Sequence, residues 1–276
     1  MKKIKFTKMV ASGNDFVVLE LKTSDLSLSS LARDICERKF GVGADGLLVL
    51  GKSKVANVKM RIFNADGSEA EMCGNGARCV AYWLNAKSKT HGVRRDIETK
   101  AGIIKSITKD DFIKINLTDP KGLKLDIPVE VGQRTLKVNF IDTGVPHVVI
   151  FVEGLDKIDV ENLGRFIRYH KIFAPRGTNV NFIEVLNDNS IKIRTYERGV
   201  EGETLACGTG STASALIFAL KSKAGNKIRV YTKGKEILSV YFKRNKNTFV
   251  DVWLQGKARI VFKGKYLSPF AENHRA

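Results

Sequence analysis

The sequence repeats itself at an offset close to half its length, and this repeat limits the possible folds more than any other feature. Residues 12–18 read SGNDFVV and residues 143–149 read TGVPHVV, so the offset from 12 to 143 is 131. Further along, Cys73 opens the segment CGNGA and Cys207 opens CGTGS, at an offset of 134. Two matches in the same order at nearly one offset indicate a duplication. The 276 residues are therefore expected to form two similar domains.

The local patterns around the repeated segments predict the same elements in both halves. Residues 59–63 and 190–196 alternate between apolar and polar side chains, which is typical of strands. Each is followed by a loop that ends at Cys-Gly-x-Gly, and then by small and apolar residues (77–84 and 211–220) that predict buried helices. Further β-branched and aromatic segments predict strands at Ile103–Ile107, Phe112–Leu117, Lys227–Tyr231, Ile237–Phe242 and Phe249–Leu254. The prediction is an α+β fold of two pseudo-symmetric domains, each a curved mixed or antiparallel sheet around a central helix.

The segment Thr118–Gly122 contains turn residues and is the predicted crossover between the halves. We expect an N-terminal domain over residues 1–119, completed by 263–276, and a C-terminal domain over 120–262. Paired domains commonly bind ligands at their junction, so the active cleft is expected between them.

Composition sets limits on location and partners. Lys and Arg outnumber Asp and Glu by 47 to 29, a net charge of +18, but the lysines are scattered and form no block typical of nucleic-acid binding. The N-terminal segment MKKIKFTKMV lacks the apolar run of a signal peptide, and no segment is long and apolar enough for a membrane span. We therefore expect a cytoplasmic protein with reduced cysteines and with neither nucleic acid nor membrane as a partner.

The two Cys-Gly-x-Gly segments are the strongest candidates for chemistry. A cysteine just before a helix lies at the positive end of the helix dipole, which is expected to lower the pKa of the thiol. Glycines let backbone N–H groups approach a ligand, and such groups bind carboxylates. Two such helix starts facing each other could hold an amino-acid carboxylate between two thiols. One sulfur would remove the α-proton and the other would deliver a proton to the opposite face, which inverts the stereocentre.

The remaining cysteines have a simpler interpretation. Cys36 and Cys79 lie in apolar helical contexts without a glycine loop and are interpreted as buried core residues. A metal site would need further Cys or His at short spacing, and the chain has four histidines in all. We therefore expect no metal and no cofactor.

Seven motifs in order resemble those of diaminopimelate epimerases and cover nearly the whole chain. They are Gly13–Phe16, Gly41–Gly46, Phe63–Ser68 leading to Cys73–Cys79, Pro146–His147, Thr178–Phe182, Tyr196–Gly199 and Ala206–Gly210. The resemblance implies interconversion of LL- and meso-2,6-diaminoheptanedioate on the way to lysine and peptidoglycan. It also implies the two-domain epimerase fold, independence of pyridoxal phosphate and metal, and a homodimer.

The resemblance also implies roles for individual residues. Cys73 and Cys207 would be the acid/base pair, with His147 and Glu197 beside them to share or accept the thiol proton. The remaining implied substrate-binding residues are Asn14, Asn64, Asn179 and Arg198 for the distal groups, and Gly74, Asn75, Gly208 and Thr209 at the helix starts. Val145 and Gly46 depart from residues common in the family, so contacts there with the distal carboxylate are not carried over.

Three alternatives stay open at this point. A racemase for another amino acid, such as proline or histidine, would keep both cysteines and change the distal pocket; Arg198 and the three asparagines favour a zwitterionic far end instead. A related isomerase would lack the cysteine pair, which this chain retains. A basic nucleic-acid-binding module would show salt-dependent binding without epimerase activity.

Overall fold

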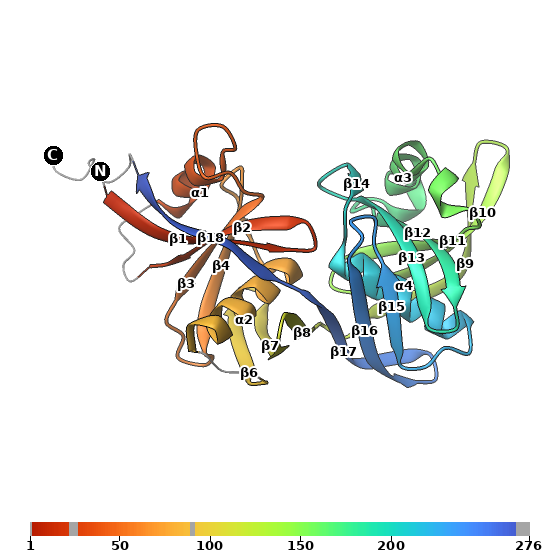
Figure 1. Ribbon diagram of the computed structural model, residues 1–276. Helices are drawn as coiled ribbons and strands as arrows, with labels where there is room; N and C mark the ends of the chain where they lie inside the picture. The colour runs from red at the N-terminus through yellow and green to blue at the C-terminus, as the bar shows by residue number, and fades with distance from the viewer. Residues whose placement is uncertain (1, 22–26, 89–91, 269–276) are drawn as a thin grey trace. The chain divides into compact units, whose positions relative to one another are not determined.

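The chain divides into two compact units. The computed structural model describes residues 2–21, 27–88 and 92–268. Unit 1 comprises residues 1–115 and 257–276, and unit 2 comprises residues 116–256 (Figure 1). The boundaries expected from the sequence, 119/120 and 262/263, lie a few residues further along the chain. No helix among the described residues is both long enough and apolar enough to cross a membrane.

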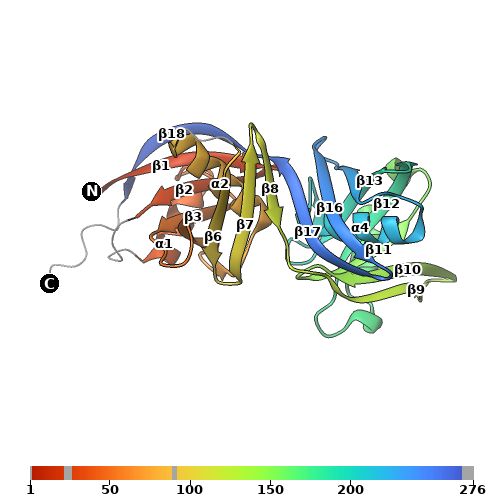
Figure 2. The ribbon, with the colours of Figure 1, turned by 90° about the horizontal axis from the view of Figure 1, so that it is seen from below.

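The described residues of unit 1 form one mixed sheet and two helices. Its strands are β1 (Lys2–Ala11), β2 (Asn14–Glu20), β3 (Gly46–Gly51), β4 (Val58–Asn64), β5 (Glu69–Ala70), β6 (Arg94–Thr99), β7 (Gly102–Lys109), β8 (Phe112–Asn116, ending at the unit boundary) and β18 (Arg259–Ser268). The strands pair in the order β18-β1-β2-β3-β4-β6-β7-β8, and the short β5 pairs with β4. β2–β3 and β4–β6 are parallel pairs and the others are antiparallel. Strands β6, β7 and β8 are seen side by side in Figure 2.

Unit 2 repeats this topology. Its strands are β9 (Lys121–Val131), β10 (Arg134–Asp142), β11 (Pro146–Phe151), β12 (Asn179–Asn187), β13 (Ser190–Glu197), β14 (Gly202–Thr204), β15 (Lys227–Tyr231), β16 (Ile237–Asn245) and β17 (Thr248–Lys257). They pair in the order β9-β10-β11-β12-β13-β15-β16-β17, with β14 on β13, and the parallel pairs β11–β12 and β13–β15 correspond to those of unit 1. The predicted duplication is confirmed by this equivalence.

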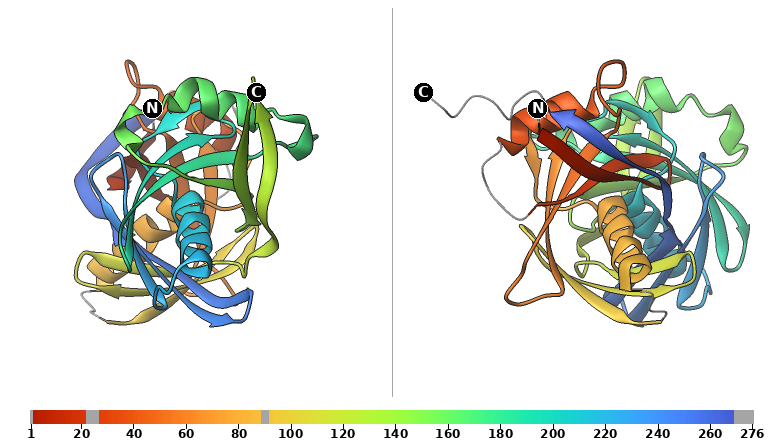
Figure 3. Two further views of the ribbon diagram at one scale, coloured as in Figure 1. Left: turned by 90° about the vertical axis from the view of Figure 1, so that its right-hand side faces the viewer. Right: turned by 60° about the vertical axis from the view of Figure 1, so that its left-hand side comes forward.

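Each unit places one helix inside its curved sheet and one outside. The inner helices are α2 (Gly74–Ser88) and α4 (Gly208–Lys221), and each packs against strands from across its own sheet (Figure 3). The outer helices are α1 (Leu28–Cys36) and α3 (Val160–Arg168), accompanied in unit 2 by the short 3-10 helices η1 (Leu155–Lys157) and η2 (Lys171–Phe173). The predicted fold class, α+β with a central helix in each half, is confirmed.

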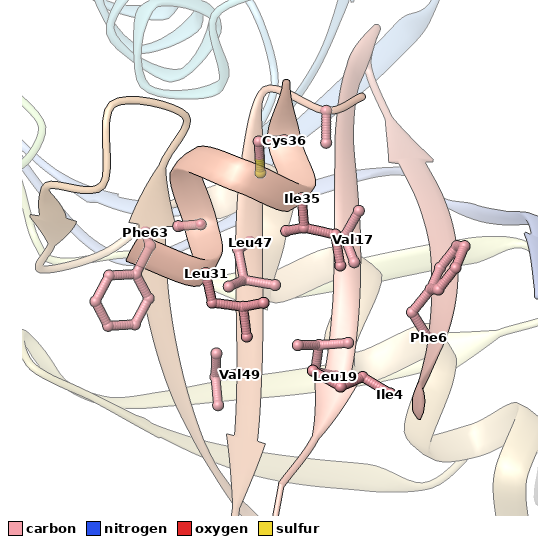
Figure 4. Packing of buried hydrophobic residues seen from close by; sticks show 12 residues of the cluster. Ile4, Phe6, Val17, Leu19, Leu31, Ile35, Cys36, Leu47, Val49 and Phe63 are labelled. Carbon is pink, nitrogen blue, oxygen red and sulfur yellow. The ribbon is translucent and has the colours of Figure 1, made fainter. Parts of the chain in front are cut away.

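The two faces of each sheet bury different kinds of side chain. On the outer face, α1 packs Leu31 and Ile35 against Val17 and Leu47 of the sheet (Figure 4). On the inner face, α4 is buried almost all round from Gly210 to Ala219, and most of its residues are small. A helix buried on all sides loses its apolar stripe, and small side chains allow the strands to approach its backbone. This packing holds α4 in place in unit 2, with Cys207 at its N-terminal end.

Candidate functional site

In unit 1, Cys73 precedes the first residue of α2. Its Sγ accepts a hydrogen bond from the Gly76 N–H at 3.4 Å, so the sulfur caps the first turn of the helix. The half-buried Cys73 thiol also donates to Oδ1 of Asn14, at an Sγ–Oδ1 distance of 3.9 Å. Asn14 is the first residue of β2, and the structure thus brings together two residues that are 59 positions apart in sequence.

A group of charged residues holds Asn14 in place. Asn14 Nδ2 donates to Asp45 Oδ2 at 2.8 Å, and the Asp15 N–H donates to the same oxygen. Arg38 Nη2 lies 2.9 Å from Asp15 Oδ1 and 2.7 Å from Asp45 Oδ1, and so joins both carboxylates. Lys8 Nζ lies 2.7 Å from Asp15 Oδ2 and also donates to the Gly43 carbonyl.

These cations determine the charge state of Asp15. Burial alone would raise the pKa of its carboxyl, but hydrogen bonds from Arg38 and Lys8 outweigh burial and hold that pKa well below its ordinary value of 3.8. The carboxylate is therefore ionised at neutral pH, and the start of β2, which carries Asn14, is fixed by charge-assisted hydrogen bonds.

Arg78 joins the helix start to the β1–β2 turn. This arginine is fully buried in α2, little more than one turn from the cysteine-capped end. Its Nη2 donates to Ser12 Oγ at 2.6 Å and to Asn75 Oδ1 at 2.5 Å. Ser12 sits in the turn before Asn14 with a φ of 53°, a left-handed conformation that side chains other than glycine adopt uncommonly. The Arg78 guanidinium thus fixes both Asn75 and the turn.

Asn64, the other residue of unit 1 predicted to bind substrate, ends β4 and is exposed. Its Nδ2 donates to Ser68 Oγ at 2.9 Å, and its backbone N–H donates to the Ser68 carbonyl. These are the local bonds of an ordinary turn, and neither of them uses the Asn64 Oδ1.

In unit 2, Cys207 is the N-cap of α4. Its backbone is extended, with φ −113° and ψ 115°, and its Sγ accepts from the Gly210 N–H at 3.4 Å, the same distance as at Cys73. Thr209 Oγ1 lies 3.5 Å from the sulfur. Cys207 is 7 % exposed, so its sulfur is more enclosed than that of Cys73.

A carboxylate accompanies Cys207. Glu197, the last residue of β13, accepts from Thr204 Oγ1 at 2.5 Å and from the Cys207 thiol. Burial raises the pKa of Glu197 and outweighs these two hydrogen bonds. Burial also raises the pKa of Cys207 well above its ordinary value, and the Glu197 charge raises it further.

The prediction that a helix start lowers the cysteine pKa is therefore wrong for Cys207. The Gly210 N–H and the Thr209 hydroxyl do stabilise the thiolate. They are outweighed by the loss of hydration in a buried site and by the neighbouring carboxylate. Cys207 is a thiol that donates to Glu197.

Asn179 and Arg198 meet at the start of β12. Asn179 Nδ2 donates to the Pro146 carbonyl at 3.0 Å, and its Oδ1 accepts from the Arg198 N–H at 2.9 Å. The guanidinium of Arg198 donates to the Arg176 carbonyl at 3.3 Å. An amide has two donors and two acceptor lone pairs, and a guanidinium has five donors. The bonds just described therefore use only part of the hydrogen-bonding capacity of Asn179 and Arg198.

His147 lies on β11 and is fully buried. Burial lowers its pKa to about 3, with a further contribution from the positive charge of Arg198. Its Nδ1 lies 3.1 Å from Nδ2 of Asn181, which sequence reasoning did not select. The pattern could have found Asn181, since it stands two residues after Asn179 on a strand and so faces the same side of the sheet.

The structure places the two other cysteines in the core, as predicted. Cys36 is 2 % exposed in the cluster under α1 (Figure 4), and burial raises its pKa to about 12. Cys79 is fully buried in α2.

Sequence reasoning missed the charged residues around Asn14 because Arg38 and Lys8 are ordinary surface types with no motif of their own.

Comparison with known proteins adds evidence of a different kind. Residues 6–122 and 139–261 match the diaminopimelate epimerase family. A diaminopimelate epimerase from Hydrogenobaculum sp. (strain Y04AAS1) is 42% identical over 275 residues, covering 94% of this chain and 96% of the relative. One from Archaeoglobus fulgidus is 44% identical over 248 residues, covering 84% and 87%.

Solved structures resemble the fold at much lower identity. A Bacillus anthracis phenazine biosynthesis protein of the PhzF family superposes with a TM-score of 0.75 at 19% identity, covering 97% of this chain and all of the other. A probable proline racemase from Agrobacterium radiobacter K84 superposes with a TM-score of 0.71 at 15% identity, covering 98% and 94%. At these identities the likeness concerns the fold.

Proposed function

The chain belongs to the diaminopimelate epimerase family, and we propose that it interconverts LL- and meso-2,6-diaminoheptanedioate with Cys73 and Cys207 as the acid/base pair. The observation that carries the mechanism is the equivalence of the two cysteines. Each precedes the inner helix of its unit, and each sulfur accepts the N–H three residues on at 3.4 Å. Duplication of the same sulfur geometry in both units supports a reaction that treats the two faces of one carbon alike.

The helix starts would bind the α-carboxylate. The first N–H groups of a helix have no acceptor within it, and the helix dipole favours an anion there. In each helix the third N–H is directed to sulfur, so the N–H groups of Gly74, Asn75, Gly208 and Thr209 are the donors for a carboxylate. When the α-carbon loses its proton, charge spreads onto this carboxylate, where the same donors stabilise it.

Proton transfer would proceed through sulfur in both directions. One cysteine, as thiolate, takes the α-proton; the electron pair of the C–H bond stays on carbon and is shared with the carboxylate. The other cysteine, as thiol, delivers a proton to the opposite face and becomes the thiolate. The pKa of Cys207, raised by burial and by the Glu197 charge, supports a starting state in which Cys207 carries its proton and delivers it to the α-carbon.

The distal end of the substrate would be held by Asn14, Asn64, Asn179 and Arg198. Amides offer donors and acceptors without added charge, which suits an ammonium and a carboxylate on one carbon. Arg198 would pair with the distal carboxylate, and its backbone is held by Asn179. This set supports a dicarboxylic diamino acid over proline, which has no second charged end.

Independence of metal and pyridoxal phosphate, a homodimeric state and a cytoplasmic location complete the proposal. Cysteine acid/base chemistry supplies the proton transfer that a pyridoxal cofactor would otherwise assist. The apolar side chains of Val261, Phe262 and Leu267 on β18 are 51%, 47% and 48% exposed, and exposed apolar side chains support contact with a second copy.

Exchange of the α-hydrogen in deuterated water tests the substrate. We expect deuterium in both epimers of diaminopimelate, and none in proline or histidine under the same conditions. Exchange with proline or histidine but not with diaminopimelate would replace the proposed substrate with another amino acid. Size-exclusion chromatography with light scattering tests the dimer separately.

A further inference from the structure

Three adjacent strands of unit 2 bring His147, Asn181 and Thr195 onto the face of the sheet that covers α4. In the registered pairs, Val149 lies opposite Asn181, and Asn181 opposite Thr195. His147 is two residues from Val149 and therefore faces the same side. All three side chains are buried, with exposed fractions of 0%, 0% and 3%. Asn181 also lies directly under the helix start, since a Cβ at Gly210 would be 2.3 Å from its Oδ1.

The orientation of the Asn181 amide is determined without reference to the histidine. Its Nδ2 lies 2.8 Å from the Val148 carbonyl, which is an acceptor only, so a nitrogen must stand there. Its Oδ1 accepts from Thr195 Oγ1 at 3.0 Å. The reverse orientation would place two carbonyl oxygens against each other in a buried site.

This orientation determines the protonation of His147. Nδ2 of Asn181 carries two hydrogens, of which one goes to Val148 and the other points to His147 Nδ1 at 3.1 Å. A nitrogen that accepts this hydrogen cannot carry its own, so in the neutral ring the hydrogen is on Nε2. Among the described residues, Nε2 has no hydrogen-bond partner although it is buried. A buried donor without a partner is uncommon and points to an acceptor that arrives from outside the protein or during the reaction.

We infer that Asn181 is a positioning residue that holds His147 as the neutral Nε2–H tautomer, so that His147 serves the site as an uncharged hydrogen-bond donor. The role in catalysis rests on the proposed epimerase function; the tautomer does not. With Nδ1 occupied and Nε2 protonated, the ring has no lone pair free to accept the thiol proton. The role expected from the sequence, sharing or accepting that proton, is replaced by donation to an anion of the reaction, a thiolate or a carboxylate oxygen.

Two-bond proton–nitrogen NMR spectra of ¹⁵N-histidine protein test the tautomer directly. The chain has four histidines, and the His147 signal is assigned by its loss in His147→Gln. In the wild-type protein we expect the protonated nitrogen to be Nε2. In Asn181→Asp, a carboxylate oxygen faces Nδ1, so the hydrogen should move to Nδ1. Nδ1–H in the wild type, or Nε2–H retained in Asn181→Asp, would overturn the inference.

Asn139→Asp is the matched control. Asn139 is also a buried asparagine of unit 2 and is 2% exposed. Its Nδ2 donates to the Val149 carbonyl and its Oδ1 accepts from the Asp126 N–H, so its hydrogen bonds among the described residues go to groups other than His147. We expect it to lower stability about as much as Asn181→Asp and to leave the Nε2–H tautomer unchanged. The same tautomer change in Asn139→Asp would assign the effect to general destabilisation and overturn the inference.

Thr195→Val is a second variant in case Asn181→Asp fails to fold. It removes the partner of Oδ1 and leaves both Nδ2 contacts, so the Nε2–H tautomer should persist with broader signals. A change of tautomer to Nδ1–H in this variant would show that Asn181 does not determine it.

Kinetics separate positioning from binding. In Asn181→Asp, kcat should fall about tenfold or more, the lower range for a misplaced catalytic proton, while KM stays within about threefold. Unchanged kcat with the altered tautomer would refute the catalytic role of the His147 donor. If the wild type shows Nε2–H but no α-hydrogen exchange with diaminopimelate, the proposed function fails and the tautomer assignment does not.

Discussion

The helix starts at Cys73 and Cys207 share one backbone geometry and differ in the groups around the sulfur. Both sulfurs accept an N–H at 3.4 Å. Cys73 is half-buried and faces the neutral amide of Asn14, whereas Cys207 is 7 % exposed and donates to the carboxylate of Glu197. Duplication therefore preserved the scaffold that holds each sulfur, while the residues that determine its protonation diverged. In a two-base reaction one sulfur starts as thiolate and the other as thiol, and the two exchange these states at each turnover.

Removing either sulfur should have the largest effect. Cys73→Ala and Cys207→Ala are each expected to reduce epimerisation by at least about 10³-fold, because each removes a proton carrier from one face of the α-carbon. The measurement is the ratio of LL to meso isomers by chiral chromatography. Cys36→Ala is the control, since Cys36 ends α1 on its buried side in the core, and its activity should stay near wild type. Full activity in either site variant would show that the replaced cysteine is not needed as a proton carrier, and that the two helix starts do not share this role.

The two units should lose stability in different pH ranges. His147 has an ordinary pKa of 6.5 that is lowered to about 3 in the fold. The unfolded chain therefore binds the proton first as pH falls, and the free energy of unfolding should decrease from about pH 6.5 toward pH 3, by about 1.4 kcal/mol per pH unit. Asp15 in unit 1, whose pKa is lowered from 3.8, stabilises the fold above that pH and loses its contribution only below it.

Urea denaturation at a series of pH values measures this difference. His147→Gln should flatten the decrease between pH 6 and pH 4, whereas Asp15→Asn should leave the slope in that range and change the behaviour below it. An unchanged slope in His147→Gln would show that His147 is not the group that takes up the proton.

The glycines at the two helix starts should tolerate alanine differently. At Gly210 a Cβ would lie 2.3 Å from Oδ1 of Asn181, which is fixed by three hydrogen bonds, so Gly210→Ala should lower the free energy of unfolding by about 1–3 kcal/mol. At Gly76 the nearest atom is a Leu48 methyl at 3.0 Å, the end of a side chain that can move. Gly76→Ala should change stability by less than about 1 kcal/mol, since the helix gains from alanine what the contact loses.

Thermal unfolding of the two variants beside the wild type provides the measurement. Equal destabilisation at both positions would contradict the difference in packing, because it would mean that the Asn181 group yields as readily as a leucine methyl.

The elements that occur in both units were predictable from the sequence. The effects of the side chains around each sulfur, which differ between the units, were not. The strands around 59–63 and 190–196, the inner helices and the two cysteines at their starts follow from periodicity and from Cys-Gly-x-Gly, which are local signals. The raised pKa of Cys207 does not, because it depends on burial of the thiol and on Glu197, ten residues earlier, meeting the sulfur in three dimensions. Arg38 was missed for the same reason, because its role comes from Asp15 and Asp45 meeting it in three dimensions, whereas the strand alternation that starts at Asn179 could have indicated Asn181.

The smallest expected effect tests the charged residues that hold Asn14. The side chain of Arg38 is 60% exposed, so Arg38→Met should change the free energy of unfolding by less than about 1 kcal/mol. It should nevertheless raise KM severalfold, because Arg38 joins the carboxylates of Asp15 and Asp45, and Asp45 accepts from the Asn14 amide. Arg94→Met removes a comparable exposed pair with Asp96, away from Asn14, and should leave KM unchanged. Equal KM in the two variants would show that the strand alone holds Asn14 in place. The neutral partner of Cys73 would then need no charged residues around it.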